Sequence, residues 1–254
     1  MVGKALPVHK PTASRVPGRA CRAQGRGQLE GEENVMIGDK LIIEQHHTDR
    51  AAEICERLTG RIGERFTIAV AGESGAGKSE LAYEIYRLFD KRGTPAGVLQ
   101  QDDYFVFPPR TNHEMRRRNL EQVGPYEVKL DFLDANLRSF KRGESPIYKP
   151  LVFYEEDRIT AEEMDVARLT VLIAEGTYTS LLRFADCRVF IDRDYRQTLE
   201  ARKRRARDKF EPFVVDVLER EHQIIAQHRR LADLVVPADF GSIQPQEPEP
   251  PGTV

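Results

Sequence analysis

The stretch that decides the fold is GESGAGKS, which runs from Gly72 to Ser79. It matches the pattern G-x-x-x-x-G-K-[ST] at its four fixed positions. The apolar, β-branched run FTIAVAG (66–72) precedes it and predicts a buried strand, whereas KSELAYEIYRLFDKRG (78–93) follows it and predicts a helix that Gly93 ends. A glycine-rich turn between a strand and a helix can direct its N–H groups at phosphate oxygens, close to the positive end of the helix.

This context predicts a phosphate-binding loop. The Lys78 ammonium can reach the β- and γ-phosphates of a nucleotide, and the Ser79 hydroxyl can ligate Mg²⁺. The whole loop is expected to bind the nucleotide: Gly72, Glu73, Ser74, Gly75, Ala76, Gly77, Lys78 and Ser79.

Further short apolar runs alternate with segments of helical spacing. Strands are predicted in AGVLQQDDYF (96–105), LTVLIAEG (169–176), CRVFIDRD (187–194) and DLVVPADF (233–240). Helices are predicted near 48–62, 113–121, 130–142, 195–209 and 212–231. The segment 145–158 predicts a strand pair or an extended excursion. Thr48 or Asp49 is the expected cap of the first helix. This alternation predicts an α/β fold of three layers, in which a parallel sheet is covered by helices on both faces. Ligands of such sheets bind beyond the carboxyl ends of the strands.

Carboxylates stand at two of these strand ends. Asp102 and Asp103 follow the second predicted strand, and Glu175 closes the third, directly before Gly176. Phosphoryl transfer needs one carboxylate that activates the acceptor and another that manages magnesium. Asp102 or Asp103 is a candidate for the first role, and Glu175 and Asp103 for magnesium. The alternatives are a surface glutamate at a turn and a pair of aspartates that only cap the next turn.

Basic residues are concentrated in EARKRRARDKF (200–210), where Arg204 and Arg207 share a helical face. They form either a solvated surface or a lid that neutralises the transferring charge. We interpret MRRRNLEQ (115–122) as a solvated helix. His46, His47, His222 and His228 lack metal-ligand spacing and are interpreted as surface residues.

Among proteins with such a loop, the sequence favours a small-molecule kinase. The guanine-reading pattern [NT]KxD of GTPases is absent. A regulatory module that binds ATP without turnover is the alternative, and the carboxylates Asp102 and Glu175 count against it.

Composition gives no sign of a nucleic-acid or membrane partner. The 254 residues are 40% hydrophobic and 31% charged, with a formal net charge of −2, and no apolar run is long enough to span a membrane. Three scattered cysteines favour a reduced, cytoplasmic setting. A homo-oligomer is left open.

Three regions are expected along the chain. Residues 1–35 are rich in Gly, Pro, Ala and Arg and predict a disordered extension, with Met36 as an alternative start and a transit peptide as the other interpretation. Residues 36–240 form the kinase domain. Residues 241–254 are rich in Pro and Glu and predict a disordered or extended tail.

The order of these motifs resembles the uridine kinase/phosphoribulokinase family of phosphate-loop kinases, from about Phe66 to Phe240. The segments that carry the resemblance are GESGAGKS, QDDYF, VLIAEGTYTSLL, VFIDRDYRQTLEARKRRARD and ADLVVP. The resemblance implies ATP and Mg²⁺ as cofactors, Asp102 as the base, Glu175 as the magnesium-linked acid, and Arg204 and Arg207 as lid arginines. Asp103 occupies the family's Ser position.

The departures from the family fall in the acceptor half. Tyr126 stands where uridine kinases have the ribose-binding Asp, the excursion at 145–158 lacks the family's His, and KFEPFVVD replaces the glycine-containing lid segment. Tyr104, Tyr126, Tyr154 and Arg158 are candidates to line a different acceptor pocket. The acceptor is expected to be a hydroxyl of a small metabolite, either uridine or cytidine or a sugar, polyol or other alcohol.

Overall fold

A computed structural model describes residues 35–36, 39–198 and 212–250 of the chain. The N-terminal extension up to residue 34, the predicted lid arginines Arg204 and Arg207, and the last four residues lie outside this part.

A mixed sheet forms the centre of the described domain. Its strands lie in the order β10 (Gln244–Pro245), β9 (Leu234–Pro237), β8 (Cys187–Asp192), β3 (Phe66–Gly72), β7 (Val171–Glu175) and β4 (Ala96–Gln100). All neighbours are parallel except β10, which pairs antiparallel with β9. Every residue of β3 and β7 is buried, as expected for strands covered on both faces. The five strands predicted from the sequence are confirmed.

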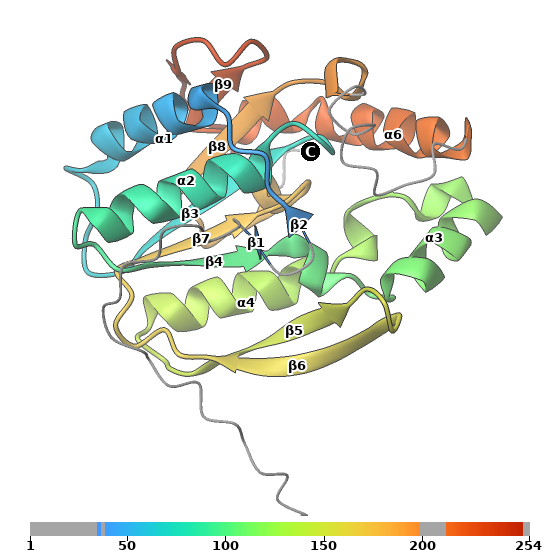
Figure 1. The fold of residues 1–254 in the computed structure, drawn as a ribbon, viewed down its shortest axis with the longest axis horizontal. Helices are drawn as coiled ribbons and strands as arrows, with labels where there is room; N and C mark the ends of the chain where they lie inside the picture. Colours follow the sequence, from blue (N-terminus) through green and yellow to red (C-terminus); the bar gives the residue numbers. More distant parts are fainter. Residues whose placement is uncertain (1–34, 37–38, 199–211, 251–254) are drawn as a thin grey trace, which may run out of the picture. The chain divides into compact units, whose positions relative to one another are not determined.

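Helices cover both faces of this sheet (Figure 1). Helices α1 (Gln45–Leu58) and α2 (Lys78–Lys91) pack on one face, and α4 (Leu130–Lys141) packs on the other. Helices α3 (Pro109–Arg118) and α6 (Pro212–Ile225) lie at the end of the sheet where β3 and β4 finish. The predicted three-layer α/β fold is confirmed.

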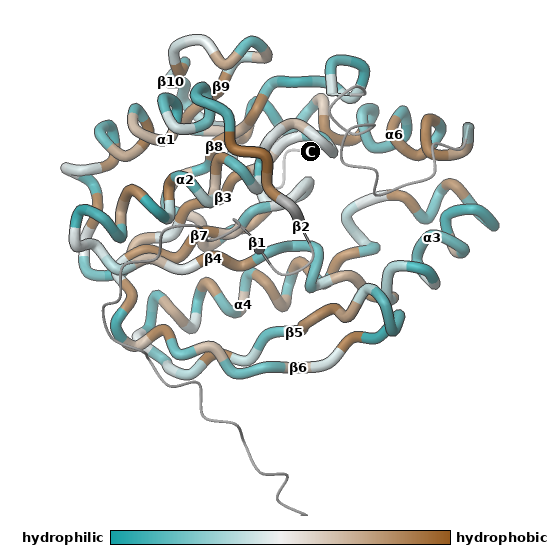
Figure 2. The backbone as a smooth tube through the Cα atoms, viewed as in Figure 1, coloured by the Kyte–Doolittle hydropathy of each residue, from teal (hydrophilic) through white to brown (hydrophobic). Residues whose placement is uncertain are grey.

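Short elements complete the described chain. They are the strands β1 (Val35–Met36) and β2 (Asp39–Lys40) and the 3-10 turns η1 (Gln101–Tyr104), η2 (Leu120–Gln122), η3 (Pro125–Glu127), η4 (Thr179–Leu181) and η5 (His228–Leu231). Figure 2 shows apolar residues along the central strands, whereas the helices alternate between polar and apolar positions.

A two-stranded hairpin occupies the excursion between α4 and β7. Strand β5 (Ile147–Phe153) pairs antiparallel with β6 (Arg158–Met164) over its whole length. It lies along α4, on the side away from the central sheet (Figure 1). The strand pair predicted here is confirmed.

Two boundaries differ from the sequence-based expectations. Helix α1 begins at Gln45 rather than at Thr48 or Asp49, because Glu44 caps it and donates its N–H to His47 Nδ1 at 3.0 Å. The packed domain also continues past the boundary predicted at residue 240, because the tail, predicted to be disordered or extended, is extended here and pairs through β10 with β9. Ile243 is buried there, and the Gln246 N–H donates to the Asp233 carbonyl at 3.0 Å.

We expect the packed tail to contribute to stability through Ile243. Its side chain is 4% exposed and belongs to the core beneath α1 and α2, so Ile243→Ala should lower the free energy of unfolding by about 2–5 kcal/mol. Urea unfolding measures this change. Ile42→Ala, at a side chain 42% exposed, is the matched control and should stay within about 0.5 kcal/mol of the parent. Equal small losses at both positions would contradict the packed tail.

Candidate active site

The phosphate loop joins β3 to α2 with the backbone conformation that an anion site requires. Gly77 has φ +99° and stands directly before α2, and a Cβ there would lie 2.9 Å from His47 Nε2. The main-chain carbonyl of Glu73 accepts a hydrogen bond from Lys78 Nζ at 2.9 Å and another from the Ala76 N–H at 3.1 Å. A concave loop with a lysine folded back over it fits a nucleotide polyphosphate.

Glu175 lies between the loop and Asp102 because of strand register. In the sheet it is the partner of Val70 on β3 and of Gln100 on β4. The loop begins two residues after Val70, and Asp102 stands two residues after Gln100. Parallel strands end at the same edge of a sheet, so the predicted base and the predicted magnesium-linked acid meet at the edge that carries the loop. Glu175 is 5% exposed, and Asp102 is half-buried on η1.

Gln101 fixes the two strand ends to each other, a role that the sequence analysis missed. A Cβ at Gly176 would lie 2.2 Å from the Gln101 Cβ, so only glycine admits this side chain here. The Gln101 Oε1 accepts the N–H of Tyr178 at 2.7 Å. The signal in the sequence was an amide next to the two aspartates, together with a glycine directly after the strand-ending Glu175.

Asp103 faces the hairpin rather than the phosphate loop. Its Oδ2 lies 2.8 Å from Lys149 Nζ, and its Oδ1 accepts the N–H of Val152 at 3.1 Å. Lys149 also pairs with Glu162 at 2.8 Å. Burial raises the pKa of Asp103, and the Lys149 ammonium opposes this effect. Both carboxylate oxygens therefore have protein partners on the hairpin, and the prediction of a magnesium ligand is corrected to a buried ion pair.

The predicted acceptor residues do not form one cluster. Tyr104 is fully buried in the core and accepts the Asn136 amide at 2.7 Å, so it cannot line an open pocket, and that prediction is corrected. Tyr126 is 60% exposed, and its hydroxyl donates to the carbonyl of Glu121. Tyr154 lies in the exposed turn of the hairpin.

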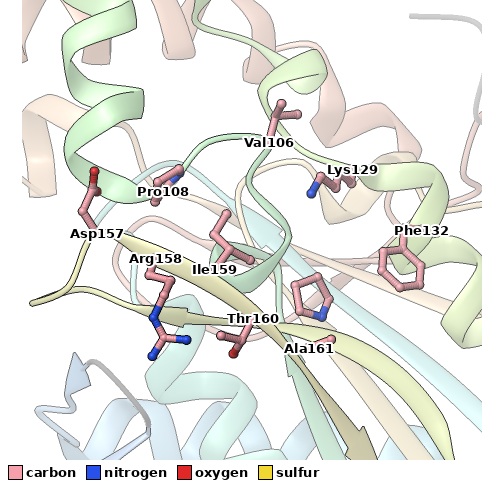
Figure 3. Close-up of a pocket in the computed structure, with 10 residues that line it drawn as sticks. Val106, Pro108, Lys129, Phe132, Asp157, Arg158, Ile159, Thr160 and Ala161 are labelled. Atoms are coloured by element: carbon pink, nitrogen blue, oxygen red, sulfur yellow. The ribbon is translucent and has the colours of Figure 1, made fainter. Parts of the chain in front are cut away.

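Arg158 borders a groove of about 510 Å³ between the hairpin and the chain that follows η1. The groove is lined by Val106, Pro108, Lys129, Phe132, Pro150, Asp157, Arg158, Ile159, Thr160 and Ala161. Figure 3 shows Val106, Lys129 and Phe132 across from the hairpin residues. The Arg158 guanidinium pairs with Glu156 and lies over the Phe153 ring. Of the four predicted acceptor residues, only Arg158 lines this groove.

Residues interpreted as solvated also prove to be structural. Arg116 lies in the helix expected to be exposed, yet it makes two bonds of 2.6 and 2.7 Å to the buried Glu127 carboxylate. Among the histidines, His228 is buried against Ser180 at 2.9 Å, and burial lowers its pKa to about 4. His222 pairs with Glu73 at 2.7 Å. The two histidines lie 48 and 149 positions from their partners, so sequence spacing carries no signal for these contacts.

The described residues contain no cluster of three or more His, Cys, Asp or Glu side chains that could hold a metal ion. A magnesium ion at Ser79 and Glu175 would therefore complete its coordination with phosphate oxygens and water, as Mg²⁺ does in nucleotide sites. None of the described helices is long and apolar enough to cross a membrane.

The fold and the site define a phosphate-loop phosphotransferase of the small-molecule kinase class. The model of the Phosphoribulokinase / Uridine kinase family matches residues 67–212, and the chain belongs to this family.

Three comparisons describe its similarity to known proteins. The chain is 31% identical over 201 residues to a bifunctional alpha-galactosidase/sucrose kinase of Mediterraneibacter gnavus, covering 74% of this chain and 21% of that protein. It is 25% identical over 183 residues to the uridine kinase of Leuconostoc citreum (strain KM20), covering 67% of this chain and 86% of the relative. The solved structure of a possible uridine kinase from Bacillus stearothermophilus matches with a TM-score of 0.56 at 17% identity, over 74% of this chain and 97% of that one.

We expect the stability of the protein to depend on the ion pair between Lys149 and Asp103, which joins the hairpin to η1. Lys149→Met leaves Asp103 buried without its ammonium partner and should lower the free energy of unfolding by about 3–5 kcal/mol, measured by urea unfolding. The double variant Asp103→Asn with Lys149→Met removes both charges and should regain part of this loss. A double variant that is no more stable than the single one would show that the ion pair does not anchor the hairpin.

Proposed function

We propose that the protein is a kinase that uses ATP and Mg²⁺ to phosphorylate a hydroxyl group of a small metabolite. The observation that supports this proposal most is the register that brings Asp102 and Glu175 to the edge of the sheet that carries the phosphate loop. A module that binds ATP without turnover would not need carboxylates at the ends of two neighbouring strands, Glu175 on β7 and Asp102 after β4.

Each residue of the site takes a separate task. The loop amides and Lys78 would hold the polyphosphate, and Ser79 and Glu175 would hold magnesium, so that the bound nucleotide supplies the transferable phosphoryl group. Asp102 accepts the proton of the acceptor hydroxyl and orients its oxygen for attack. Arg204 and Arg207 remain proposals as charge-neutralising residues, since they lie outside the described part of the chain.

We propose a sugar or another polyol, rather than a nucleoside, as the acceptor. Two observations support this choice. Tyr126 occupies the position of the ribose-binding Asp of uridine kinases, and its hydroxyl is bound to the carbonyl of Glu121. The relative with 31% identity is described as a sucrose kinase, although this chain spans only about a fifth of it. Tyr154 and Arg158 stay proposed acceptor contacts, and a uridine or cytidine kinase is the alternative.

An acceptor screen tests this proposal directly. Purified protein is incubated with Mg-ATP and a library of sugars, polyols and nucleosides, and phosphorylated products are identified by mass spectrometry. A phosphorylated sugar or polyol is expected. Uridine or cytidine monophosphate as the main product would favour the alternative, whereas tight ATP binding without any product would overturn the kinase function.

The role of Asp102 predicts a selective loss of turnover. In Asp102→Asn the proton acceptor is gone while the loop is unchanged, so kcat should fall at least about 100-fold and the Kd for Mg-ATP should change little. Steady-state kinetics and calorimetry measure the two quantities. Asp90→Asn, at the exposed end of α2, is the matched control and should behave like the parent. A kcat for Asp102→Asn within a few-fold of the parent would exclude Asp102 as the base.

A further inference from the structure

Glu73 places a carboxylate inside the loop that is expected to hold a polyphosphate. Its side chain is buried, and the residue is 5% exposed. A buried carboxylate is costly unless it is paired, and next to bound phosphates it adds a like charge. The position is a variable one in the loop pattern, so the pattern itself does not require an acid there.

The carboxylate is bound on both oxygens by residues that lie far away in the sequence. Its Oε2 accepts the main-chain N–H of Tyr195 at 2.6 Å, and its Oε1 lies 2.7 Å from Nδ1 of His222 on α6. The next loop residue is held from the same side, because the Thr198 hydroxyl, which is fully buried, donates to the carbonyl of Ser74 at 3.1 Å. Burial raises the pKa of Glu73, and the bonds from His222 and Tyr195 oppose this rise.

The main-chain carbonyl of Glu73 faces Lys78, the lysine of the phosphate loop. The Glu73 carbonyl accepts Lys78 Nζ at 2.9 Å and the Ala76 N–H at 3.1 Å. The side chain is fixed to Tyr195 and His222 while the carbonyl closes the loop, so the position of Glu73 determines where the first half of the loop and Lys78 rest.

We propose that Glu73 is a positioning residue that pre-organises the phosphate loop through His222 and Tyr195. The proposal requires that the benefit of a preformed loop exceed the repulsion that one carboxylate exerts on the nucleotide. The inference rests on the proposed function only in requiring that this loop binds a nucleotide.

Three substitutions at this position separate geometry from charge. Glu73→Ala removes both bonds and should weaken Mg-ATP binding about tenfold or more. Glu73→Asp keeps the charge but is one methylene too short for both partners, and should weaken binding similarly. Glu73→Gln keeps an acceptor for the Tyr195 N–H and removes the charge, and should stay within about threefold of the parent. Calorimetric titration with Mg-ATP measures these values without an acceptor, so a failure to find any kinase activity leaves the test intact.

Substitutions at His222 give a second test of the same contact, since an asparagine amide nitrogen can replace Nδ1. His222→Ala should weaken Mg-ATP binding, and His222→Asn should restore part of the affinity. His222→Ala combined with Glu73→Ala should cost little more than Glu73→Ala alone, because the two residues act through one contact.

The control for a merely structural role is another buried carboxylate. Glu84 on α2 is 2% exposed and bonds Thr48 at 2.8 Å and Arg87. Glu84→Ala should lower the melting temperature about as much as Glu73→Ala while the Kd for Mg-ATP stays unchanged. Binding by Glu73→Ala that equals or exceeds that of the parent, or an equal loss of affinity in both variants, would overturn the proposal.

Discussion

The parallel pairing of β7 with β3 on one side and β4 on the other is the constraint on which the rest of the site depends. It sets Glu175 opposite Val70 and Gln100, so the loop that follows β3 and the turn that follows β4 emerge on either side of one carboxylate. Gly176 keeps the arrangement close, because any side chain there would collide with Gln101. A shift of either pairing by one residue would place a different residue of β3 or β4 opposite Glu175, and would move the loop or the η1 turn along the end of the sheet.

The acidic residues near this edge differ through their partners rather than through their chemistry. Asp103 is neutralised by Lys149 and joins the hairpin to the end of β4, whereas Glu73 is bonded to His222 and joins the loop to α6. The Asp103–Lys149 ion pair and the Glu73 carboxylate are buried, so each of these contacts fixes a position more than it adds net stability. Asp102 is half-buried on the same 3-10 turn as Asp103 and makes no ion pair with a basic residue of the described chain, which suits the proton-accepting role proposed for it.

Much of the nucleotide half could be predicted from the sequence, because its signals are local. A strand, a glycine turn and a helix lie within 30 residues, and the strand that ends in Glu175 is a continuous apolar run. The partners of Asp103 and Glu73 could not be predicted, since Lys149 lies 46 positions from the first and His222 lies 149 positions from the second. The prediction that Tyr104 lines the acceptor pocket failed because the chain leaves β4 as a 3-10 turn. Such a turn ends the alternation that a strand would impose on successive side chains.

The acceptor half of the site shows the same limit on prediction, because its arrangement depends on charge pairs rather than on a local motif. Asp103 pairs with Lys149, 46 positions away, and Arg116 pairs with Glu127, 11 positions away, and each pair requires both partners to be present together. These pairs join the hairpin to η1 and α3 to η3 by contacts within the protein. The hydroxyl of the exposed Tyr126 donates to the carbonyl of Glu121 on η2, and this contact supports the proposal of an acceptor other than a nucleoside.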